Sequence, residues 1–401
     1  MPSQDSPSSR PPLACRVVLN SNTIVGIDAA KQLPEQLTRF GSRAPLLVID
    51  TAVARTAQVA SLLADWAAHG VALTGTIESR ADAEPDYDYL DAVTDGVRGL
   101  GCDAVIGVGG GSALDLAKGV GILLRNTGRG IDYRGMDRVT QPGVPVILLP
   151  TTAGSGSEVT ATASFVDHAS QTKLGINGRH VGCSLAILDA RLTVSCPASV
   201  TSGSGLDALV HAVEAVTART ATPVSALLGA EAVRLVFRAL ARAVQAPDDL
   251  HARTDVLLGS HYAGLAMCNA GGGPASGISY PVGVHYRVPH GWAGGLLLPH
   301  VVAANVAKGY THGYARLYEA LDARDQALTD DAAKAAAFRD AFFGLMLEIS
   351  APDTFGQWGI VQASVARLTD LTIEQRQANL DLNPVLFDRA DVTALLARVA
   401  A

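Results

Sequence analysis

The first half of the chain alternates short apolar runs, many of them rich in β-branched residues, with longer segments of helical periodicity. The short runs predict strands at Pro45–Asp50, Val71–Ile77, Asp103–Val108 and Pro145–Leu149. A helix is expected from Ser112 to Leu124, directly after the third of these strands. Strands that alternate with helices are typical of a parallel sheet with crossover helices, so we expect an α/β domain here.

From about Ser199 the pattern changes to long segments rich in alanine and leucine. These segments predict helices at Gly205–Val216, Pro223–Val244, Leu250–Met267, Asp331–Ile349 and Ala390–Ala400. The second half is therefore expected to be all-α. We expect a disordered tail over residues 1–14, an α/β domain over 15–196 and an all-helical domain over 197–401.

Composition narrows the class of protein. The chain has 401 residues, enough for one large or two medium domains, and its net charge of −7 argues against nucleic acid as a partner. No segment is apolar and long enough to span a membrane, and the N-terminus lacks the apolar run of a signal peptide. The five cysteines are scattered without CxxC spacing, which favours a cytoplasmic protein with reduced, mostly buried thiols.

A glycine triplet follows the third predicted strand. Gly109, Gly110, Gly111 and Ser112 lie between that strand and the next helix. Glycines allow close approach of the backbone to a pyrophosphate, and the N-terminus of a helix favours negative charge. The triplet therefore predicts a nucleotide site, although most such runs are ordinary turns. It is not a GxGxxG fingerprint, so no standard Rossmann unit is claimed.

A carboxylate and two imidazoles form a candidate metal site. Asp207 and His211 are four residues apart, which places them on one face of a helix, and His290 follows in Pro289-His290-Gly291. Together they can bind a divalent ion and leave a position open for substrate. Alternatively, Asp207 is a favourable charge near a helix N-terminus and the histidines are satisfied core residues.

With the run PTTAGSGSEVT from Pro150 to Thr160, these motifs resemble the iron-containing (group III) alcohol dehydrogenase family. Asp115 and Lys118 complete the family's GGGSxxDxAK pattern, and the resemblance covers nearly the whole chain after its first dozen or so residues. It implies a dinucleotide-binding α/β domain, an all-helical domain, an active site between them and a homodimer. The implied activity is the NAD(H)-dependent interconversion of a small alcohol and an aldehyde or ketone.

The resemblance also assigns cofactor residues beyond the glycines. It places Asp50 at the adenosine ribose, where a carboxylate favours NAD(H) over NADP(H), and Thr151 and Thr152 near the nicotinamide. Lys173 resembles the lysine that reaches the cofactor ribose. The alternatives are a turn residue or helix cap for Asp50, a strand-end turn for the threonines and a surface lysine for Lys173.

The chain departs from the family pattern before Pro289-His290-Gly291. The family usually has His, three residues, then His-Pro-Leu-Gly. Here Ser276 stands at the first histidine, a metal ligand in the family, and Tyr280 at the second, beside the substrate. Serine is a poor ligand for iron or zinc, so only three family-type ligands remain, and we expect weak or absent metal binding. His285 can be considered as a replacement ligand, but the family has no ligand at that position.

Tyr280 has three possible roles: filling the volume of the lost imidazole, shaping the substrate pocket, or donating a proton to a reduced carbonyl. A tyrosine acid needs a nearby cation, for which Arg287 and His290 are the sequence candidates. Arg287 can alternatively bind an anionic substrate group or lie in solvent. A non-redox protein on the same fold, lyase-like or merely nucleotide-binding, is the competing hypothesis.

Overall fold

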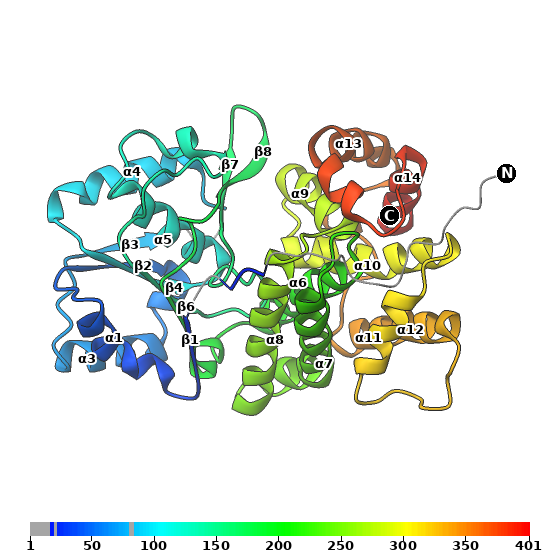
Figure 1. Ribbon diagram of the computed structural model, residues 1–401, viewed down its shortest axis with the longest axis horizontal. Coiled ribbons are helices and arrows are strands. Elements are labelled where there is room, and N and C mark those ends of the chain that lie inside the picture. Colours follow the sequence, from blue (N-terminus) through cyan, green and yellow to red (C-terminus); the bar gives the residue numbers. More distant parts are fainter. Residues whose placement is uncertain (1–16, 20–21, 80–83) are drawn as a thin grey trace.

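The computed structural model describes residues 17–19, 22–79 and 84–401, and it divides into an α/β part and a helical part that lie side by side (Figure 1). The expected fold class is confirmed. The tail predicted over residues 1–14 lies outside the described residues. No helix of the described chain is long and apolar enough to cross a membrane.

A six-stranded parallel sheet forms the centre of the α/β part. Its order is β1-β9-β6-β4-β2-β3. The strands are β1 (Asn22–Val25), β2 (Pro45–Asp50), β3 (Gly75–Ser79), β4 (Ala104–Gly109), β6 (Val146–Pro150) and β9 (Leu185–Leu188). The prediction for β2 is confirmed, and β4 and β6 begin one residue later than predicted. β3 begins at Gly75 rather than Val71, because the Val71 amide donates to the Trp66 carbonyl and closes the preceding helix.

Helices cover both faces of this sheet. Leucines of α1 (Leu33–Arg39) and α3 (Ala57–Ala68) pack with Leu47 and Ile49 on one face. α4 (Tyr87–Val97) and α5 (Gly111–Leu123) pack with Leu46 and Val48 on the other. Alternate residues of β2 thus face opposite apolar layers, which is why its sequence is apolar throughout. The predicted helix from Ser112 to Leu124 corresponds to α5.

A second, three-stranded sheet was not predicted. It is made of β5 (Gly135–Met136), β8 (Thr172–Asn177) and β7 (Thr162–Asp167), in that order, with β7 and β8 antiparallel. The short elements around the two sheets are α2 (Thr51–Ala54), η1 (Ala29–Gln32), η2 (Arg98–Leu100), η3 (Gly130–Tyr133) and η4 (Ala190–Thr193). β8 carries Lys173 and lies on the side of the α/β part that meets the helices (Figure 1).

The helical part packs around α6. Its helices are α6 (Ala198–Thr217), α7 (Pro223–Gln245), α8 (Leu250–Cys268), α9 (Pro274–Tyr286), α10 (His290–Ala307), α11 (His312–Ala320), α12 (Asp331–Glu348), α13 (Val365–Leu382) and α14 (Arg389–Val399), with η5 (Gly356–Trp358) and η6 (Gln362–Ser364). α6 begins at Ala198 rather than Gly205, and it is buried over most of its length. α9 and α10, which were not predicted, contain Pro281 and Pro299 inside the helix.

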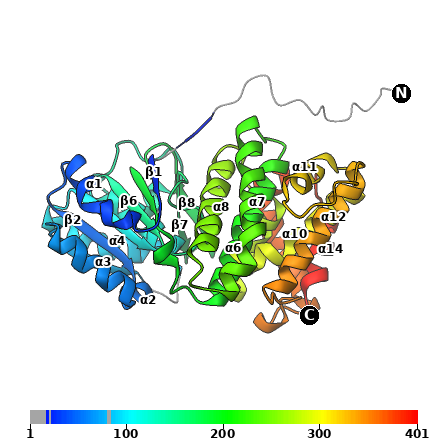
Figure 2. The same ribbon diagram turned by 90° about the horizontal axis from the view of Figure 1, so that it is seen from below.

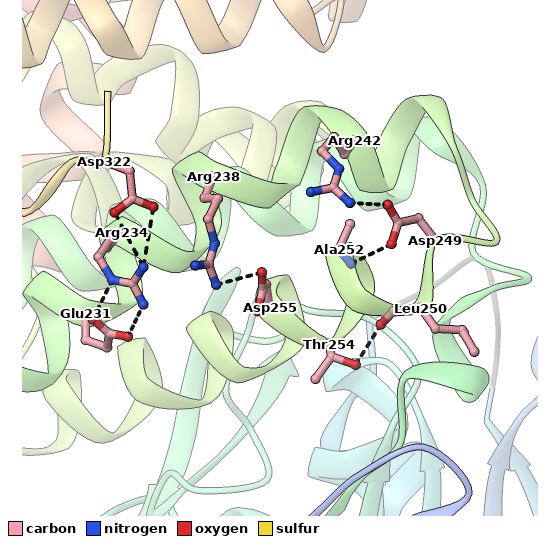
Figure 3. A network of polar contacts seen from close by, with 10 residues as sticks. All are labelled: Glu231, Arg234, Arg238, Arg242, Asp249, Leu250, Ala252, Thr254, Asp255 and Asp322. Atoms are coloured by element: carbon pink, nitrogen blue, oxygen red, sulfur yellow. Dashed lines mark hydrogen bonds and ion pairs between the residues drawn. The ribbon is translucent and has the colours of Figure 1, made fainter. Parts of the chain in front are cut away.

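Ion pairs on the outside join α7 to its neighbours (Figure 3). Arg238 and Arg242 of α7 pair with Asp255 and Asp249 of the α8 segment, at 2.8 and 2.5 Å. Such exposed pairs contribute little to stability, because solvent screens them. Of the described cysteines, Cys183 is buried, whereas Cys102, Cys196 and Cys268 are half-buried, so the expectation of mostly buried thiols is wrong.

Candidate active site

A cleft of about 1260 Å³ is lined by both parts of the chain. From the α/β part come Gly111, Ser112, Asp115, Thr152 and Lys173, and from the helical part come Asp207, His211, Ser276, Tyr280 and His290. The structure therefore brings together, in one cavity, most of the residues that the sequence singled out. The exceptions, which do not line this cleft, are Asp50, Gly109, Gly110, Lys118, Thr151, His285 and Arg287.

The N-terminus of α5 opens into the cleft. Gly110 is its cap residue and supplies no side chain to the first turn, so the helix N-terminus is left to bind an anion. A Cβ on Gly111 would lie 2.7 Å from Oγ of Ser155, and one on Gly109, where φ is +154°, would lie 2.9 Å from Cβ of Asp50. The nearby Ser155 and Asp50 leave no room for a side chain at these positions, so both require glycine. A helix N-terminus kept open in this way fits a pyrophosphate.

Asp115 stabilises the segment that forms the cleft wall beside this helix. Its carboxylate accepts from the Ser157 hydroxyl (2.5 Å) and the Ser164 amide (2.9 Å), and it forms an ion pair with Lys118 at 3.0 Å. Lys118 is buried and donates to the Ser157 carbonyl at 2.8 Å. Although Asp115 lines the cleft, its oxygens are used to hold the segment from Ser157 to Ser164 in place.

Asp50 ends β2 and Thr151 follows β6, the two strands on either side of β4. Oδ1 of Asp50 accepts from the amides of Ala52 and Val53, at 2.8 and 3.2 Å, and caps α2. Thr151 is buried, and its hydroxyl has no hydrogen-bond partner among the described residues. The adjacent Thr152 faces the cleft. Asp50 therefore acts as a helix cap through Oδ1, and its Oδ2 has no hydrogen-bond donor among the described residues.

Lys173 is held at the cleft by Glu84, which the sequence reading missed. Nζ of Lys173 lies 2.9 Å from Oε2 of Glu84, and the Ser112 hydroxyl donates to the same oxygen at 3.1 Å. Burial lowers the pKa of Lys173, but the charge and hydrogen bond of Glu84 outweigh it, and the net pKa is raised. Lys173 is therefore a charged group aimed by an ion pair rather than a surface lysine.

The candidate metal ligands lie together. Asp207 and His211 come from α6, and His290 is the first residue of α10. Both helices belong to the helical part (Figure 2). One ligand atom from each lies within 4.8 Å of the others. Nε2 of His211 is 3.6 Å and Nε2 of His290 is 3.9 Å from Oδ1 of Asp207. Burial lowers the pKa of His290 to about 4 despite the opposing effect of Asp207, so its imidazole is neutral at pH 7.

The Ser279 hydroxyl lies within hydrogen-bond distance of both ring nitrogens of His290. The Ser279 hydroxyl donates to the Ser276 carbonyl at 2.7 Å and lies 3.0 Å from Nδ1 of His290. Nε2 of His290 lies 3.4 Å from the same hydroxyl oxygen. Since the hydroxyl proton is used on that carbonyl, the oxygen accepts from the ring nitrogen that carries the proton, and the other ring nitrogen keeps a lone pair. His211 has a buried Nδ1 without a partner among the described residues. Such a set of donors fits a divalent metal.

Ser276 is turned toward Glu214, another residue that the sequence reading missed. Its hydroxyl donates to Oε2 of Glu214 at 2.5 Å, and the same carboxylate accepts from the amides of Gly273 and Ala275, each at 2.7 Å. Burial raises the pKa of Glu214. The spacing from His211 to Glu214 on α6 could have indicated a side chain on the same face. Glu214 therefore fixes the N-terminus of α9.

Tyr280 contacts both His290 and an arginine, but that arginine is not Arg287. Its ring centroid is 4.8 Å from that of His290, and Cζ of Arg376 lies 3.9 Å from the Tyr280 centroid. Arg287 is exposed, with φ of 57° at the end of α9, and does not line the cleft. The hypothesis that Arg287 is the cation beside Tyr280 is wrong. His285 also lies outside the cleft and cannot replace a ligand.

Comparison with known proteins gives the same family over both parts. The model "Iron-containing alcohol dehydrogenase" matches residues 20–190, and "Fe-containing alcohol dehydrogenase family, C-terminal" matches residues 201–400. The chain is 32% identical to long-chain-alcohol dehydrogenase 1 of Geobacillus thermodenitrificans, over 95% of each chain. It is 34% identical to the NAD-dependent methanol dehydrogenase of Bacillus methanolicus, over 78% of this chain and 81% of that one.

A solved structure of a 1,3-propanediol oxidoreductase superposes with a TM-score of 0.88 at 26% identity, over 96% of this chain and 100% of that chain. The relatives are redox enzymes, so this protein is an oxidoreductase of the alcohol dehydrogenase type, and the non-redox hypothesis is not supported. With family models matching nearly all of both parts, the chain belongs to the iron-containing alcohol dehydrogenase family.

Proposed function

We propose that the protein interconverts a small alcohol and an aldehyde or ketone with NAD(H), and that it needs a metal weakly or not at all. The observation that carries the proposal is the shared cleft. The open N-terminus of α5 and the cluster of Asp207, His211 and His290 line one cavity, as pyrophosphate binding and carbonyl chemistry require.

In this proposal the cofactor extends along the α/β wall. Its pyrophosphate binds at Gly110–Ser112, the adenosine ribose lies at Asp50, and the nicotinamide end lies toward Thr151 and Thr152. Lys173 donates to a ribose hydroxyl, and Glu84 aims it. Thr151 shapes the strand end rather than touching the cofactor, since its hydroxyl is buried away from the cleft.

The chemistry takes place beside Tyr280 and His290. When bound, NADH would supply the hydride for the carbonyl carbon, and with a proton added to the carbonyl oxygen the products would be an alcohol and NAD+. Tyr280 supplies a hydroxyl for the hydrogen bond to that oxygen, and the neighbouring neutral His290, held by Ser279, orients it. In oxidation the same groups accept the proton.

A divalent ion, iron or zinc, would be held by Asp207, His211 and His290. When bound, it would polarise the carbonyl oxygen as a Lewis acid. Ser276 adds no fourth ligand, because its hydroxyl is engaged by Glu214. Three ligands instead of four should lower the affinity, which is why we propose weak binding or none.

The test combines turnover with metal analysis. NADH oxidation is measured with a panel of aldehydes and ketones, before and after dialysis against a chelator, and the metal content is measured in parallel. Reduction that survives the chelator supports the proposal. Stoichiometric iron or zinc that survives prolonged dialysis contradicts the weak-metal part, and no NADH oxidation with any carbonyl contradicts the redox part.

The variant Ser276→His sharpens the metal measurement. An imidazole restores the family's fourth ligand type and should raise the affinity for zinc, whereas Ser276→Ala should leave it unchanged.

We further propose that residues 15–196 and 197–401 are the two domains, that the protein is a homodimer and that it is cytoplasmic. Light scattering that gives the mass of a monomer at micromolar concentration would contradict the dimer.

A further inference from the structure

Arg376 is a buried cation for which the described part of the chain supplies no counter-ion. It is 8% exposed, and its Nη2 donates to the Lys173 carbonyl at 2.6 Å. Its buried Nε has no hydrogen-bond partner, and no carboxylate forms an ion pair with it among residues 17–19, 22–79 and 84–401. The chain departs from helical geometry at this residue, with φ of −131° and ψ of 20° inside α13.

Burial without an anion is unfavourable for a guanidinium. The Tyr280 ring, 3.9 Å from Cζ, offsets part of the lost hydration through a cation–π contact. Even so, burial lowers the pKa of Arg376. Buried charges in proteins are normally paired, so an unpaired one facing a cleft indicates that a ligand supplies the missing charge.

The position of Arg376 identifies which ligand this is. It lines the same cleft as His290, and both contact the one ring of Tyr280. The guanidinium and the imidazole are therefore separated by no more than those two contact distances together, the length of a short carbon chain. Asn379, one turn further along α13, also lines the cleft and adds an amide donor.

The other cations of the cleft are already accounted for. Lys173 is paired with Glu84, and Arg179 is exposed. The cofactor's pyrophosphate is assigned to the N-terminus of α5, on the other wall. Arg376 is thus the cation available to the substrate rather than to the cofactor.

We propose that Arg376 binds an anionic head group, a carboxylate or a sulfonate, at the far end of a short aldehyde or alcohol. The reacting carbon of that substrate lies at Tyr280 and His290. This proposal rests on the proposed function, which it deepens by naming the substrate class. A planar guanidinium pairs with two oxygens of such a group at once.

The kinetic test compares two aldehydes of similar length with NADH as reductant. Succinic semialdehyde carries a carboxylate, and pentanal does not. We expect a higher kcat/KM for succinic semialdehyde in the wild type, and at least about a tenfold fall in the ratio of the two values in Arg376→Met. Arg376→Lys should give an intermediate ratio, because it keeps the charge but loses the planar fork.

The matched control is Arg287→Met, which removes the exposed arginine at the end of α9 and should leave the ratio at its wild-type value. A purely structural role for Arg376, through its bond to the Lys173 carbonyl, would impair both aldehydes equally and leave the ratio unchanged. An unchanged ratio in Arg376→Met therefore overturns the proposal.

A binding measurement keeps this inference separate from the redox proposal. Calorimetric titration of the NAD+ complex with butyrate and with propane-1-sulfonate should show at least tenfold weaker binding in Arg376→Met than in the wild type, and a smaller loss in Arg376→Lys, which keeps the charge. The tighter of the two anions identifies the head group. Binding without turnover would support the anion site while rejecting the reductase, and wild-type binding of neither anion would reject the site.

Discussion

The two walls of the cleft are built in different ways. On the α/β wall, the candidate phosphate site is a helix N-terminus without a capping side chain, kept open by glycines. On the helical wall, every proposed contact is a side chain: Asp207, His211, Tyr280, His290 and Arg376. A site made of backbone amides depends on shape, whereas a site made of side chains changes its chemistry with each substitution.

The departures from the family pattern lie on the second wall. Ser276 and Tyr280 are both on α9, and Arg376, which has no ion pair with any described residue, packs on Tyr280. Substitutions on the helical wall can therefore change the metal affinity and the preferred charge of the substrate, while the cofactor site on the α/β wall stays the same. The following predictions test whether the two walls are in fact independent.

The largest effect is expected from His290→Ala. Loss of the imidazole beside Tyr280 should lower kcat by about 10²- to 10⁴-fold, the usual contribution of a positioned acid–base group. The affinity for NADH, measured by fluorescence titration, should stay close to that of the wild type. The control is His300→Ala, on the same helix but packed on Phe343 outside the cleft, which should retain its kcat. A parallel fall in NADH affinity would refute the independence of the two walls.

The converse change is Gly111→Val. Its side chain would meet Ser155 at the mouth of the phosphate site, so the dissociation constant for NADH should rise by about 10- to 100-fold. Gly96→Val is the matched control, because a Cβ at Gly96 of α4 meets nothing within 4 Å. Equilibrium fluorescence titration measures both variants. Wild-type affinity in Gly111→Val would remove the pyrophosphate from this helix N-terminus.

Stability should depend on Glu214, which fixes α9. A glutamine there would turn an amide NH₂ toward the donors of Gly273, Ala275 or Ser276, so Glu214→Gln should lose about 1–3 kcal/mol. Thermal unfolding should show a lower Tm than in the wild type. Glu374→Gln, at an exposed position of α13, is the control and should unfold like the wild type. Equal Tm values for the two variants would show that Glu214 does not hold α9.

The sequence predicted the α/β wall better than the helical wall, and the reason is locality. Gly109 to Ser112 lie between a strand and a helix in one short segment, so their pattern already contains the geometry of the site. The sequence also predicted that Asp207 and His211 lie together, because helix periodicity alone places residues four apart on one face. Their proximity to His290 followed from the family resemblance, and the structure supplies the distances.

The rest depends on tertiary contacts that no local pattern contains. Arg376 comes near Tyr280 only because α13 packs on α9, so the sequence suggested the nearer Arg287 instead. Ser276 was recognised as a lost ligand, but its bond to Glu214 needed the packing of α9 on α6. α9 and α10 escaped prediction because internal prolines and glycines interrupt their helical periodicity.

The smallest effect is expected at Asp50, where the two roles of one carboxylate can be separated. Asp50→Asn keeps a side-chain oxygen that can cap α2 but removes the charge that repels a 2′-phosphate, whereas Asp50→Gly removes both. Both variants should therefore lower the preference for NADH over NADPH by about 3- to 10-fold, and only Asp50→Gly should also lose stability, by about 0.5 kcal/mol. Dissociation constants for the two reduced cofactors and the Tm of each variant measure the two roles. Equal wild-type affinity for NADH and NADPH would show that Asp50 is a helix cap and does not select the cofactor.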